Sequence, residues 1–282
     1  MHFCGKALRT FGYVRFSAKA PIEKTLKNLT KANYRTHPSY LLVKIMIQNI
    51  PKHIAIILDG NGRWAKKHHL PTSAGHKAGA DTLRNIANYA ESLGVKYLTA
   101  YTFSTENWKR PQKEVDYLLG LLEDYIDRYI KDTKKNNMKF VVIGDKTALN
   151  AKLQQKIDSL HELSAEKSGL QLNMAINYGG KDEIVRAAKK IAADHAAGEI
   201  STEQITEEFF DKYTDTSKTP YPDLLIRTGG DMRLSNFLLW QIAYSELYFT
   251  DTLWPDFKDK DLLTAIESYT GRNRRFGRRD TN

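Results

Sequence analysis

Short apolar runs rich in β-branched residues alternate with longer segments of helical period from residue 53 onward, and this alternation constrains the fold most. The predicted strands span 54–59, 95–103, 138–144, 170–177, 223–229 and 246–249. Amphipathic helices, with apolar residues at three- and four-residue intervals, are predicted between them at 78–94, 112–132, 150–169 and 181–200. Strands that alternate with helices imply right-handed crossovers and a parallel sheet covered on both faces. We therefore predict, for residues 51–282, a single α/β domain with about six mostly parallel strands flanked by helices.

The formal net charge of +10 is concentrated at the two ends of the chain. Residues 1–50 carry +8 and residues 271–282 carry +4, which leaves −2 for the chain between them. A near-neutral body argues against nucleic-acid binding, which needs a basic patch on the folded domain, so we expect no nucleic-acid partner. The basic ends could bind anionic lipid headgroups or could simply be exposed to water. Peripheral contact with a membrane is therefore one expectation.

Residues 1–50 are predicted to form a basic N-terminal extension of unknown role, with part of it disordered. It resembles an organellar targeting segment only weakly, and we favour either a variable extension or a translation start at Met46. The single cysteine, Cys4, excludes a disulfide framework and a cysteine-based zinc site and fits a reducing compartment. No run approaches the roughly 20 apolar residues that span a bilayer, so we expect a cytoplasmic protein.

Polar, glycine-rich segments follow four of the predicted strands. Ligands bind at the carboxyl ends of the strands in open α/β sheets, so we expect these segments to meet at one edge. They are Asp59-Gly60-Asn61-Gly62-Arg63, Ser104-Thr105-Glu106-Asn107-Trp108 with Arg110, Asn177-Tyr178-Gly179-Gly180, and the run from Arg227 to Arg233. Backbone N–H groups, arginines and a few acids at one edge suit an anionic substrate and a metal-binding carboxylate.

Asp59 ends an apolar strand, where a carboxylate is costly unless something uses it. The G-x-G-x-x-A spacing that begins at Gly60 is also that of a dinucleotide fingerprint, but the acid expected about 20 residues later is replaced by Asp81 within a predicted helix. An aspartyl phosphatase would need a second acid nearby, and the P-loop motif is absent. A carboxylate beside a glycine loop and Arg63 instead suits Mg²⁺ and a diphosphate, with the positive end of the following helix aimed at the phosphates.

Six ordered blocks of sequence resemble the cis-prenyltransferase family, of the undecaprenyl diphosphate synthase type. They are HIAIILDGNGRWA, AGHKAG, YTFSTENWKRP, INYGG, LLIRTGGDMRLSNFLLWQIAYSELYF and LWPDF, and the resemblance runs from about His53 to Gly277. It implies six mostly parallel strands, a hydrophobic tunnel, a homodimer and Mg²⁺ as cofactor. The implied reaction condenses isopentenyl diphosphate onto an allylic diphosphate such as farnesyl diphosphate, giving a cis-polyprenyl diphosphate. Undecaprenyl diphosphate, for cell-wall lipid carrier synthesis, is the product that we expect.

The resemblance also implies roles for individual residues. Asp59 matches the family's essential Mg²⁺-associated aspartate, and Glu246 matches a second metal-associated acid. The positions that match the allylic diphosphate loop and its neighbours are Gly60, Asn61, Gly62, Arg63, Trp64 and His76. Those that match the block nearest the reacting carbons, where a proton leaves C2 of isopentenyl diphosphate, are Ser104, Thr105, Glu106, Asn107, Trp108 and Arg110, with Asn107 as the catalytic member. The isopentenyl diphosphate site matches Arg227, Arg233 and Ser235, and the C-terminal element that reaches a neighbouring subunit matches Arg275 and Gly277.

Two features depart from these expectations. Where the family normally has an arginine, three residues before the Gly75-His76 pair, this chain has Thr72. Losing a guanidinium from a diphosphate site removes charge-assisted hydrogen bonds worth roughly 1.5–3 kcal/mol, or about 10- to 150-fold in an equilibrium constant. Glu246 stands at the start of the last predicted strand, whereas Asp59 stands at the end of the first.

A non-catalytic or weakly active partner subunit of a cis-prenyltransferase complex is the alternative hypothesis, and Thr72 is the feature in its favour. Taken singly, Asp59 suits a helix cap and Arg227 suits a surface ion pair. The apolar faces at 82–94 and 115–126 suit ordinary core as well as a tunnel wall. Taken together at four strand ends, so many phosphate-suited groups favour an active enzyme.

Overall fold

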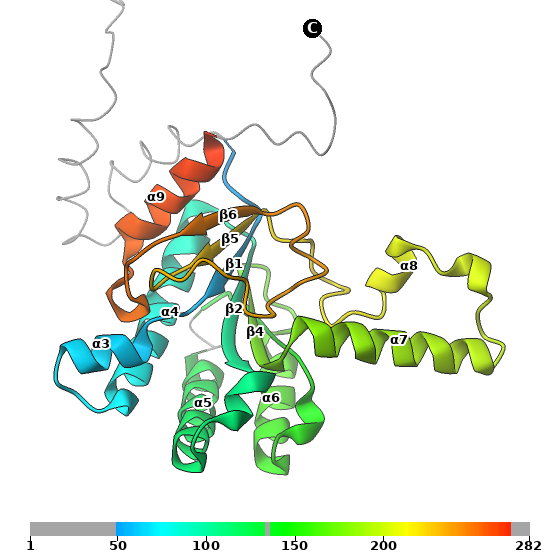
Figure 1. Cartoon of the computed structure of the whole chain (residues 1–282), viewed down its shortest axis with the longest axis horizontal. Helices are drawn as coiled ribbons and strands as arrows, with labels where there is room; N and C mark the ends of the chain where they lie inside the picture. Colours follow the sequence, from blue (N-terminus) through cyan, green and yellow to red (C-terminus); the bar gives the residue numbers. More distant parts are fainter. Residues whose placement is uncertain (1–48, 133–135, 272–282) are drawn as a thin grey trace, which may run out of the picture. The chain divides into compact units, whose positions relative to one another are not determined.

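Six parallel strands form one sheet in the computed structural model, which describes residues 49–132 and 136–271 (Figure 1). In chain order they are β1 (His53–Ile57), β2 (Tyr97–Ser104), β3 (Lys139–Ile143), β4 (Gln171–Tyr178), β5 (Leu224–Arg227) and β6 (Glu246–Phe249). Their order across the sheet is β3-β4-β2-β1-β5-β6, and every neighbouring pair is parallel. The predicted α/β fold with six mostly parallel strands is therefore confirmed.

Burial explains why the strands were recognisable. All five residues of β1 and all four of β5 are buried, and a strand covered on both faces appears in the sequence as a continuous apolar run. β6 lies at one edge of the sheet and is only partly buried along its length. The sheet thus has its apolar centre at β1, directly before Asp59.

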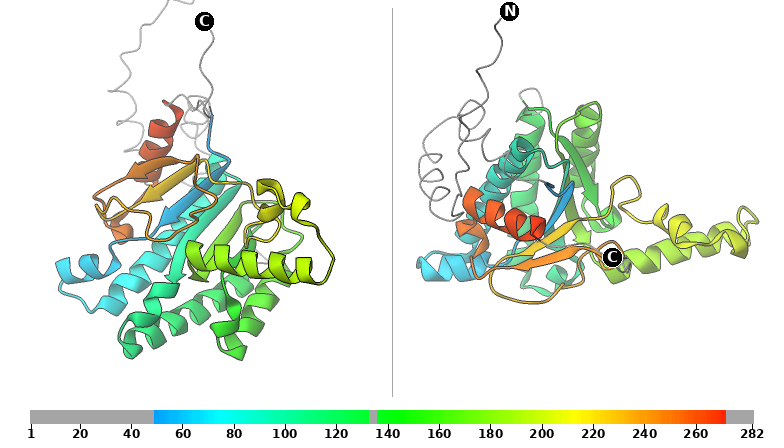
Figure 2. Two further views of the ribbon diagram at one scale, coloured as in Figure 1. Left: turned by 45° about the vertical axis from the view of Figure 1, so that its right-hand side comes forward. Right: turned by 90° about the horizontal axis from the view of Figure 1, so that it is seen from above.

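Seven helices accompany the sheet in the described ranges. They are α3 (Asn61–Lys67), α4 (Thr72–Leu93), α5 (Gln112–Asp132), α6 (Ala151–Ser164), α7 (Gly180–Ala196), α8 (Glu207–Asp211) and α9 (Asp259–Thr270). Short 3₁₀ turns are η1 (Thr105–Lys109), η2 (Lys146–Ala148), η3 (Thr202–Gln204) and η4 (Trp254–Asp256). The four predicted helices correspond to α4, α5, α6 and α7, and Figure 2 shows α7 and α8 extending away from the sheet.

Two helices differ from the sequence-based expectation. α4 begins at Thr72 rather than at residue 78, directly after Pro71 in an extended conformation. Its first turns pack on α3, where a Cβ on Gly75 would lie 2.1 Å from the Asn61 carbonyl oxygen, so small residues replace the apolar period there. α9 was not predicted, although its buried face, which includes Leu262 and Ile266, has helical spacing.

The strand register decides which predicted site residues meet. Ile57 pairs with both Tyr101 and Arg227, so the carboxyl ends of β1 and β5 lie level. β2 continues for three residues beyond that level, to Ser104, and the polar segments after all three strands lie on the same side of the sheet. Glu246 pairs with Leu224 at the amino ends of β6 and β5. Glu246 therefore lies about 10 Å along the strands from the level of Arg227, at the amino ends of the strands and not at their carboxyl ends.

Several predicted features fall outside the described residues. These are the extension up to residue 48 and the basic tail from residue 272, which contains Arg275 and Gly277. In the ranges that are described, none of the helices combines the length and the apolar character needed to cross a membrane.

Candidate active site

A polar cleft of about 1210 Å³ lies at the carboxyl ends of β1, β2 and β5. It brings together nine of the residues that sequence reasoning assigned to the site. Its polar lining consists of Asp59, Asn61, His76, Tyr101, Thr102, Ser104, Glu106, Asn107, Arg110, Arg227, Ser235 and Asn236. Three of the four predicted segments therefore meet in one cleft, and residues 177–180 are not among its lining residues.

Asp59 is held between two arginines. Its Oδ1 accepts a hydrogen bond from Arg63 Nη2 at 2.7 Å and its Oδ2 accepts one from Arg227 Nη2 at 2.9 Å. The Asp59 carbonyl accepts from Thr228 Oγ1 at 2.7 Å and from the Trp254 amide at 3.0 Å, which fixes the backbone. Burial alone would raise the pKa of Asp59, but the hydrogen bonds from Arg227 and Arg63 outweigh burial and lower it. Asp59 is therefore an ionised carboxylate at neutral pH.

Arg227 is the most deeply buried charge of the cleft, with 4% of its side chain exposed. Besides Asp59, its guanidinium donates to Ser235 Oγ at 2.7 Å, to the Arg233 carbonyl and to Asp231 Oδ2 at 3.3 Å. Its Nε is buried and finds no hydrogen-bond partner among the described residues. Arg227 thus joins the segment after β1 to the loop after β5.

Arg63 reaches back from α3 to the same loop. Its Nη1 donates to the Gly229 carbonyl while Nη2 holds Asp59. Gly229 has a left-handed φ of +83°, and a Cβ there would lie 2.6 Å from Arg63 Nη2. Only glycine fits without displacing the guanidinium. Gly229 is therefore required by the approach of Arg63, whereas a Cβ on Gly230 would instead lie 2.9 Å from Asp251 Oδ1.

The loop after β5 is strained. Ser235, Asn236 and Leu238 have φ values of +48°, +63° and +48°, a region that costs a non-glycine residue roughly 1–2 kcal/mol. Such backbone persists only where its surroundings over-determine it, and it clusters at ligand sites. The conformation directs Ser235 Oγ to Arg227 and places Asn236 in the cleft lining.

The block after β2 forms the short 3₁₀ turn η1. Asn107 Oδ1 accepts from the Ser104 amide at 3.0 Å in a capping box, so Asn107 braces its own turn while it lines the cleft. Arg110 donates to Glu114 of α5 at 2.8 Å. Glu106 Oε1 accepts from Asn236 Nδ2 at 2.8 Å. Burial would raise the pKa of Glu106, but the hydrogen bond from Asn236 and those within the turn lower it.

Two polar atoms at the inner end of the cleft are buried without a hydrogen-bond partner in the described part of the chain: His76 Nε2 and Asn61 Oδ1. The nearest carboxylate to His76 is Glu114 Oε1, at 3.6 Å. Burial, followed by the charge of Arg110, lowers the pKa of His76 against the opposing effect of Glu114. A buried polar atom without a partner costs about 1–3 kcal/mol, and Asn61 Oδ1 lies against Gly79, where a Cβ would come within 2.2 Å of it.

An apolar cavity of about 680 Å³ continues from the cleft. The two share five lining residues, which are Leu58, Asn61, His76, Thr102 and Leu118. Its remaining walls come mostly from α4 and α5, and include Leu83, Leu121, Leu122, Tyr125 and Tyr129. Only part of the predicted apolar face of α4 is used, because Ile86 and Ala87 are buried core that does not line the cavity.

The remaining predicted residues lie around the cleft or away from it. Trp64 Nε1 donates to Asp256 at 2.8 Å, and Trp108 Nε1 donates to Asn177 at 2.7 Å, so both anchor their segments. Arg233 is exposed and pairs with Asp231 at 2.7 Å. Glu246 lies at the amino end of β6, whereas Asp59 follows the carboxyl end of β1, so the two do not meet within one chain. Asn236 was not predicted, because nothing in the sequence marks its left-handed backbone.

The donors around Asp59 bear on metal binding. The described residues contain no group of three or more His, Cys, Asp or Glu side chains that could hold a metal ion by themselves. They do offer the ionised Asp59 carboxylate, which lines the cleft. Mg²⁺ is usually bound by one or two carboxylates with substrate phosphates and water as further ligands, so this donor set fits Mg²⁺ brought with a diphosphate.

Curated relatives match most of the chain. An isoprenyl transferase from Streptococcus mutans is 52% identical over 237 residues, which is 83% of this chain and 95% of the relative. One from Fusobacterium nucleatum is 54% identical over 232 residues, 82% and 98% of the two chains. One from Bacillus subtilis is 48% identical over 238 residues, 84% and 92% of the two chains.

Solved structures and a family model agree with these relatives. The crystal structure of lavandulyl diphosphate synthase from Lavandula x intermedia, in complex with dimethylallyl diphosphate, has a TM-score of 0.79 at 40% identity and covers 81% of this chain and 98% of that one. A "probable undecaprenyl diphosphate synthase" from Campylobacter jejuni has a TM-score of 0.69 at 33% identity, covering 82% and 100%. Residues 57–277 match the family described as "Putative undecaprenyl diphosphate synthase". The chain therefore belongs to the cis-prenyltransferase family and is a prenyltransferase.

Proposed function

We propose that this enzyme condenses isopentenyl diphosphate repeatedly onto an allylic diphosphate such as farnesyl diphosphate, with Mg²⁺, to make undecaprenyl diphosphate. The observation that carries the proposal is the junction of a charged cleft with an apolar cavity through five shared lining residues. A diphosphate needs the first environment and a growing hydrocarbon chain needs the second. The allylic diphosphate bound in the lavandulyl diphosphate synthase structure supports the same class of substrate here.

The allylic diphosphate is assigned to the segment after β1. When its carbon–oxygen bond breaks, negative charge develops on the leaving diphosphate, and fixed donors then stabilise the transition state more than the ground state. We assign Arg63, His76 and the first amides of α3 as these donors. A Cβ on Gly62 would meet nothing closer than Thr72 Cγ2 at 3.9 Å, so the protein leaves room above this amide for a phosphate.

Mg²⁺ is assigned to Asp59, with substrate phosphates as further ligands, where it would supply positive charge to the leaving diphosphate. Asp59 itself is kept ionised and immobile by Arg63 and Arg227. A metal role for Glu246 would require a second subunit, because β6 is a regular strand that places Glu246 at the amino ends of the strands. We therefore propose a homodimer whose partner also supplies the element that contains Arg275 and Gly277.

Isopentenyl diphosphate is assigned to the loop after β5 and to η1. Arg227, Arg233 and Ser235 would hold its diphosphate, and Asn107 would act beside C2, from which a proton leaves as the new carbon–carbon bond forms. This reaction does not require a covalent intermediate on any of the described side chains of the cleft. We further propose a cytoplasmic enzyme in peripheral contact with the membrane, because the product partitions into lipid.

A turnover assay tests the proposal. The protein is incubated with labelled isopentenyl diphosphate, farnesyl diphosphate and Mg²⁺, and the extracted lipid is sized by chromatography. We expect a polyprenyl product that disappears when EDTA removes the metal. Absence of product in isolation, but activity after addition of an active family member, would favour the partner-subunit alternative. Absence of product under both conditions would overturn the proposal.

Thr72→Arg is expected to improve binding of the allylic substrate. Thr72 is the first residue of α4, and its Cγ2 would lie 3.9 Å from a Cβ built on Gly62, so a guanidinium at position 72 could reach the phosphates. The gain of charge-assisted bonds should lower the KM for farnesyl diphosphate by about 10-fold or more. Ser73→Arg, which adds the same charge one residue away, is the matched control. Unchanged KM and kcat in Thr72→Arg would contradict the assignment.

Tyr125→Ala is expected to lengthen the product. The Tyr125 ring lines the apolar cavity and its hydroxyl donates to Asp81 Oδ1 at 2.7 Å. Removing the ring opens the cavity wall, so the product distribution should shift to longer chains. Ile126→Ala is the control, because Ile126 is buried in the same helix without lining the cavity and should cost stability alone, about 2–5 kcal/mol. An identical product distribution in both variants would mean that Tyr125 is ordinary core.

A further inference from the structure

Two side-chain hydrogen bonds join the segment from Ser104 to Arg110, here called the η1 segment, to Asn177 and Asn236, in addition to the bond from Arg110 to Glu114. Trp108 Nε1 donates to Asn177 Oδ1 at 2.7 Å. Asn236 Nδ2 donates to Glu106 Oε1 at 2.8 Å. Both asparagines have left-handed backbone, with φ of +48° and +63°, a conformation that asparagine tolerates better than most residues. The η1 segment is thus held at two points, Glu106 and Trp108, by asparagines with left-handed backbone.

Asn236 makes three contacts at once. While Nδ2 holds Glu106, its Oδ1 accepts from the Lys181 amide at 2.8 Å and its carbonyl accepts from the Gly180 amide at 2.7 Å. A Cβ on Gly179 would lie 2.8 Å from Asn236 Nδ2 and 2.6 Å from Thr105 Oγ1. Glycine at 179 is therefore what allows the η1 segment and Asn236 to close on the turn at residues 177–180.

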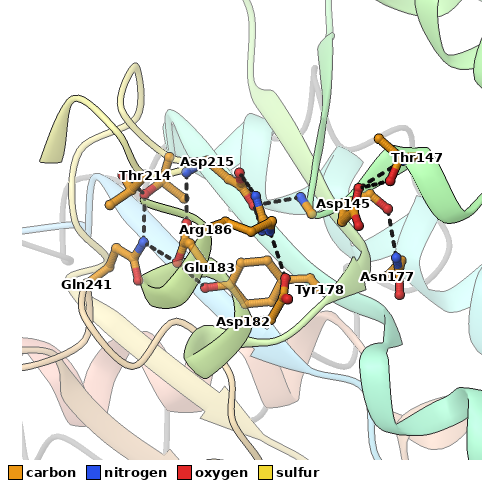
Figure 3. A network of polar contacts seen from close by, with 12 residues as sticks. Asp145, Thr147, Asn177, Tyr178, Asp182, Glu183, Arg186, Thr214, Asp215 and Gln241 are labelled. Carbon is orange, nitrogen blue, oxygen red and sulfur yellow. Dashed lines mark hydrogen bonds and ion pairs between the residues drawn. The ribbon is translucent and has the colours of Figure 1, made fainter. Parts of the chain in front are cut away.

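That turn is itself anchored by a buried polar network (Figure 3). Asn177 Nδ2 donates to the Asp145 carbonyl at 2.7 Å, and the Tyr178 hydroxyl donates to Glu183 Oε2 at 2.6 Å. Glu183 is 1% exposed, and its other oxygen accepts from the Asp215 amide at 2.9 Å. Because a buried network whose members are hydrogen-bonded in this way is rigid, the turn is a fixed support for Asn236.

Asn236 is also connected to the proposed isopentenyl diphosphate site through the residue before it in the sequence. Its neighbour Ser235 accepts from Arg227, and Arg227 holds Asp59. We propose that Asn236 is a positioning residue for the reaction: it fixes Glu106, and through Glu106 the η1 segment, against the rigid turn at residues 177–180. This inference rests on the proposed function, because the reacting carbons are assigned to the η1 segment.

The hydrogen bond from Asn236 to a carboxylate is charge-assisted and roughly twice as strong as a neutral one. Its loss frees the η1 segment to move, and displacements of about 1 Å at a reacting centre cost on the order of 10²-fold in rate. We therefore expect kcat to fall by about 10- to 100-fold in Asn236→Gly, a variant that keeps the left-handed backbone. The KM for the allylic substrate should change little, since that substrate is assigned to the segment after β1.

A double-mutant cycle separates positioning from simple structural support. Asn236→Asp keeps the acceptor for the Lys181 amide but sets a carboxylate against Glu106. It should lower kcat strongly in the wild-type background. In a Glu106→Gln background the reversed pair can again form a hydrogen bond, so Asn236→Asp should cost little or raise kcat. An equal loss in both backgrounds would overturn the proposal.

A second measurement does not depend on turnover. Hydrogen exchange of the peptide that covers residues 104–110 should be faster in Asn236→Gly than in the wild type. Asn150→Ala, which removes the cap that Asn150 Oδ1 gives the Leu153 amide at 2.8 Å, is the control and should leave this peptide and kcat unchanged. Unaltered exchange in Asn236→Gly would refute the proposal that Asn236 holds the η1 segment in place. This outcome can be read even if the wild-type protein makes no polyprenyl product and the proposed function itself fails.

Discussion

Asp59→Asn is expected to lower kcat by about 10²- to 10³-fold while leaving the protein folded. The substitution keeps the shape of the side chain and one acceptor oxygen but removes the negative charge. In the wild type the arginines hold the pKa of Asp59 below its ordinary value, so the charge is present throughout the neutral range. Its loss would remove the carboxylate assigned to Mg²⁺ and the acceptor of one of the two arginine hydrogen bonds.

The measurement is steady-state turnover at several Mg²⁺ concentrations. A defect in metal binding should raise the Mg²⁺ concentration needed for half-maximal rate, in addition to lowering kcat. Asp223→Asn is the matched control, because Asp223 Oδ2 accepts from the Lys52 and His53 amides at the amino end of β1, 2.8 and 3.0 Å away. It should lower the melting temperature with little effect on kcat. Wild-type kcat and wild-type Mg²⁺ dependence in Asp59→Asn would contradict the assignment.

The sheet and one edge of the site were predictable because they follow from burial. β1 and β5 are covered on both faces, so each is an uninterrupted apolar run that stops where polar chemistry begins, at Asp59 and Arg227. Parallel register then places the ends of such runs together. The cleft could therefore be anticipated from the strand ends, before any contact was known.

The parts that were not predictable depend on backbone conformation and on distant contacts. Asn236 stands in a loop whose left-handed φ values have no counterpart in the residue pattern, since serine and leucine adopt them beside it. Its role appears only when Gly180 and Glu106, far away in sequence, are seen to bond to it. The start of α4 was missed for a related reason, because its first turns pack on α3 through small residues.

Glu246 shows the limit of assigning a role by sequence match. The strand prediction around Glu246 is confirmed, and that same strand places it at the amino ends of the strands, away from Asp59. The sequence match gives Glu246 a metal-associated role, but the position of Glu246 in the fold keeps it away from Asp59. The two agree only if another subunit completes the site. The proposed roles of Arg275 and Gly277 carry the same condition, and both lie outside the described residues.

Arg227→Lys is expected to lower kcat/KM for isopentenyl diphosphate by about 10²-fold or more, although the charge is retained. The guanidinium of Arg227 serves acceptors on Asp59, Ser235, Asp231 and the Arg233 carbonyl, and a single ammonium group cannot reproduce that planar set of donors. Asp59 would lose a fixed partner and its pKa should rise toward the ordinary value. The loop that carries Ser235 would also lose its link to the segment after β1.

Arg186→Lys separates this loss from a general loss of stability. Arg186 also bridges carboxylates in a partly buried place, with Asp215 at 2.6 Å and Asp182 at 2.7 Å, but it does not line the cleft. Both variants should therefore unfold at lower temperature, as expected when an arginine that bridges carboxylates is replaced by lysine. Arg227→Lys should lower kcat/KM far more than Arg186→Lys does. If the two variants lost activity in proportion to their melting temperatures, Arg227 would be a structural ion pair and the isopentenyl diphosphate site would have to be placed elsewhere.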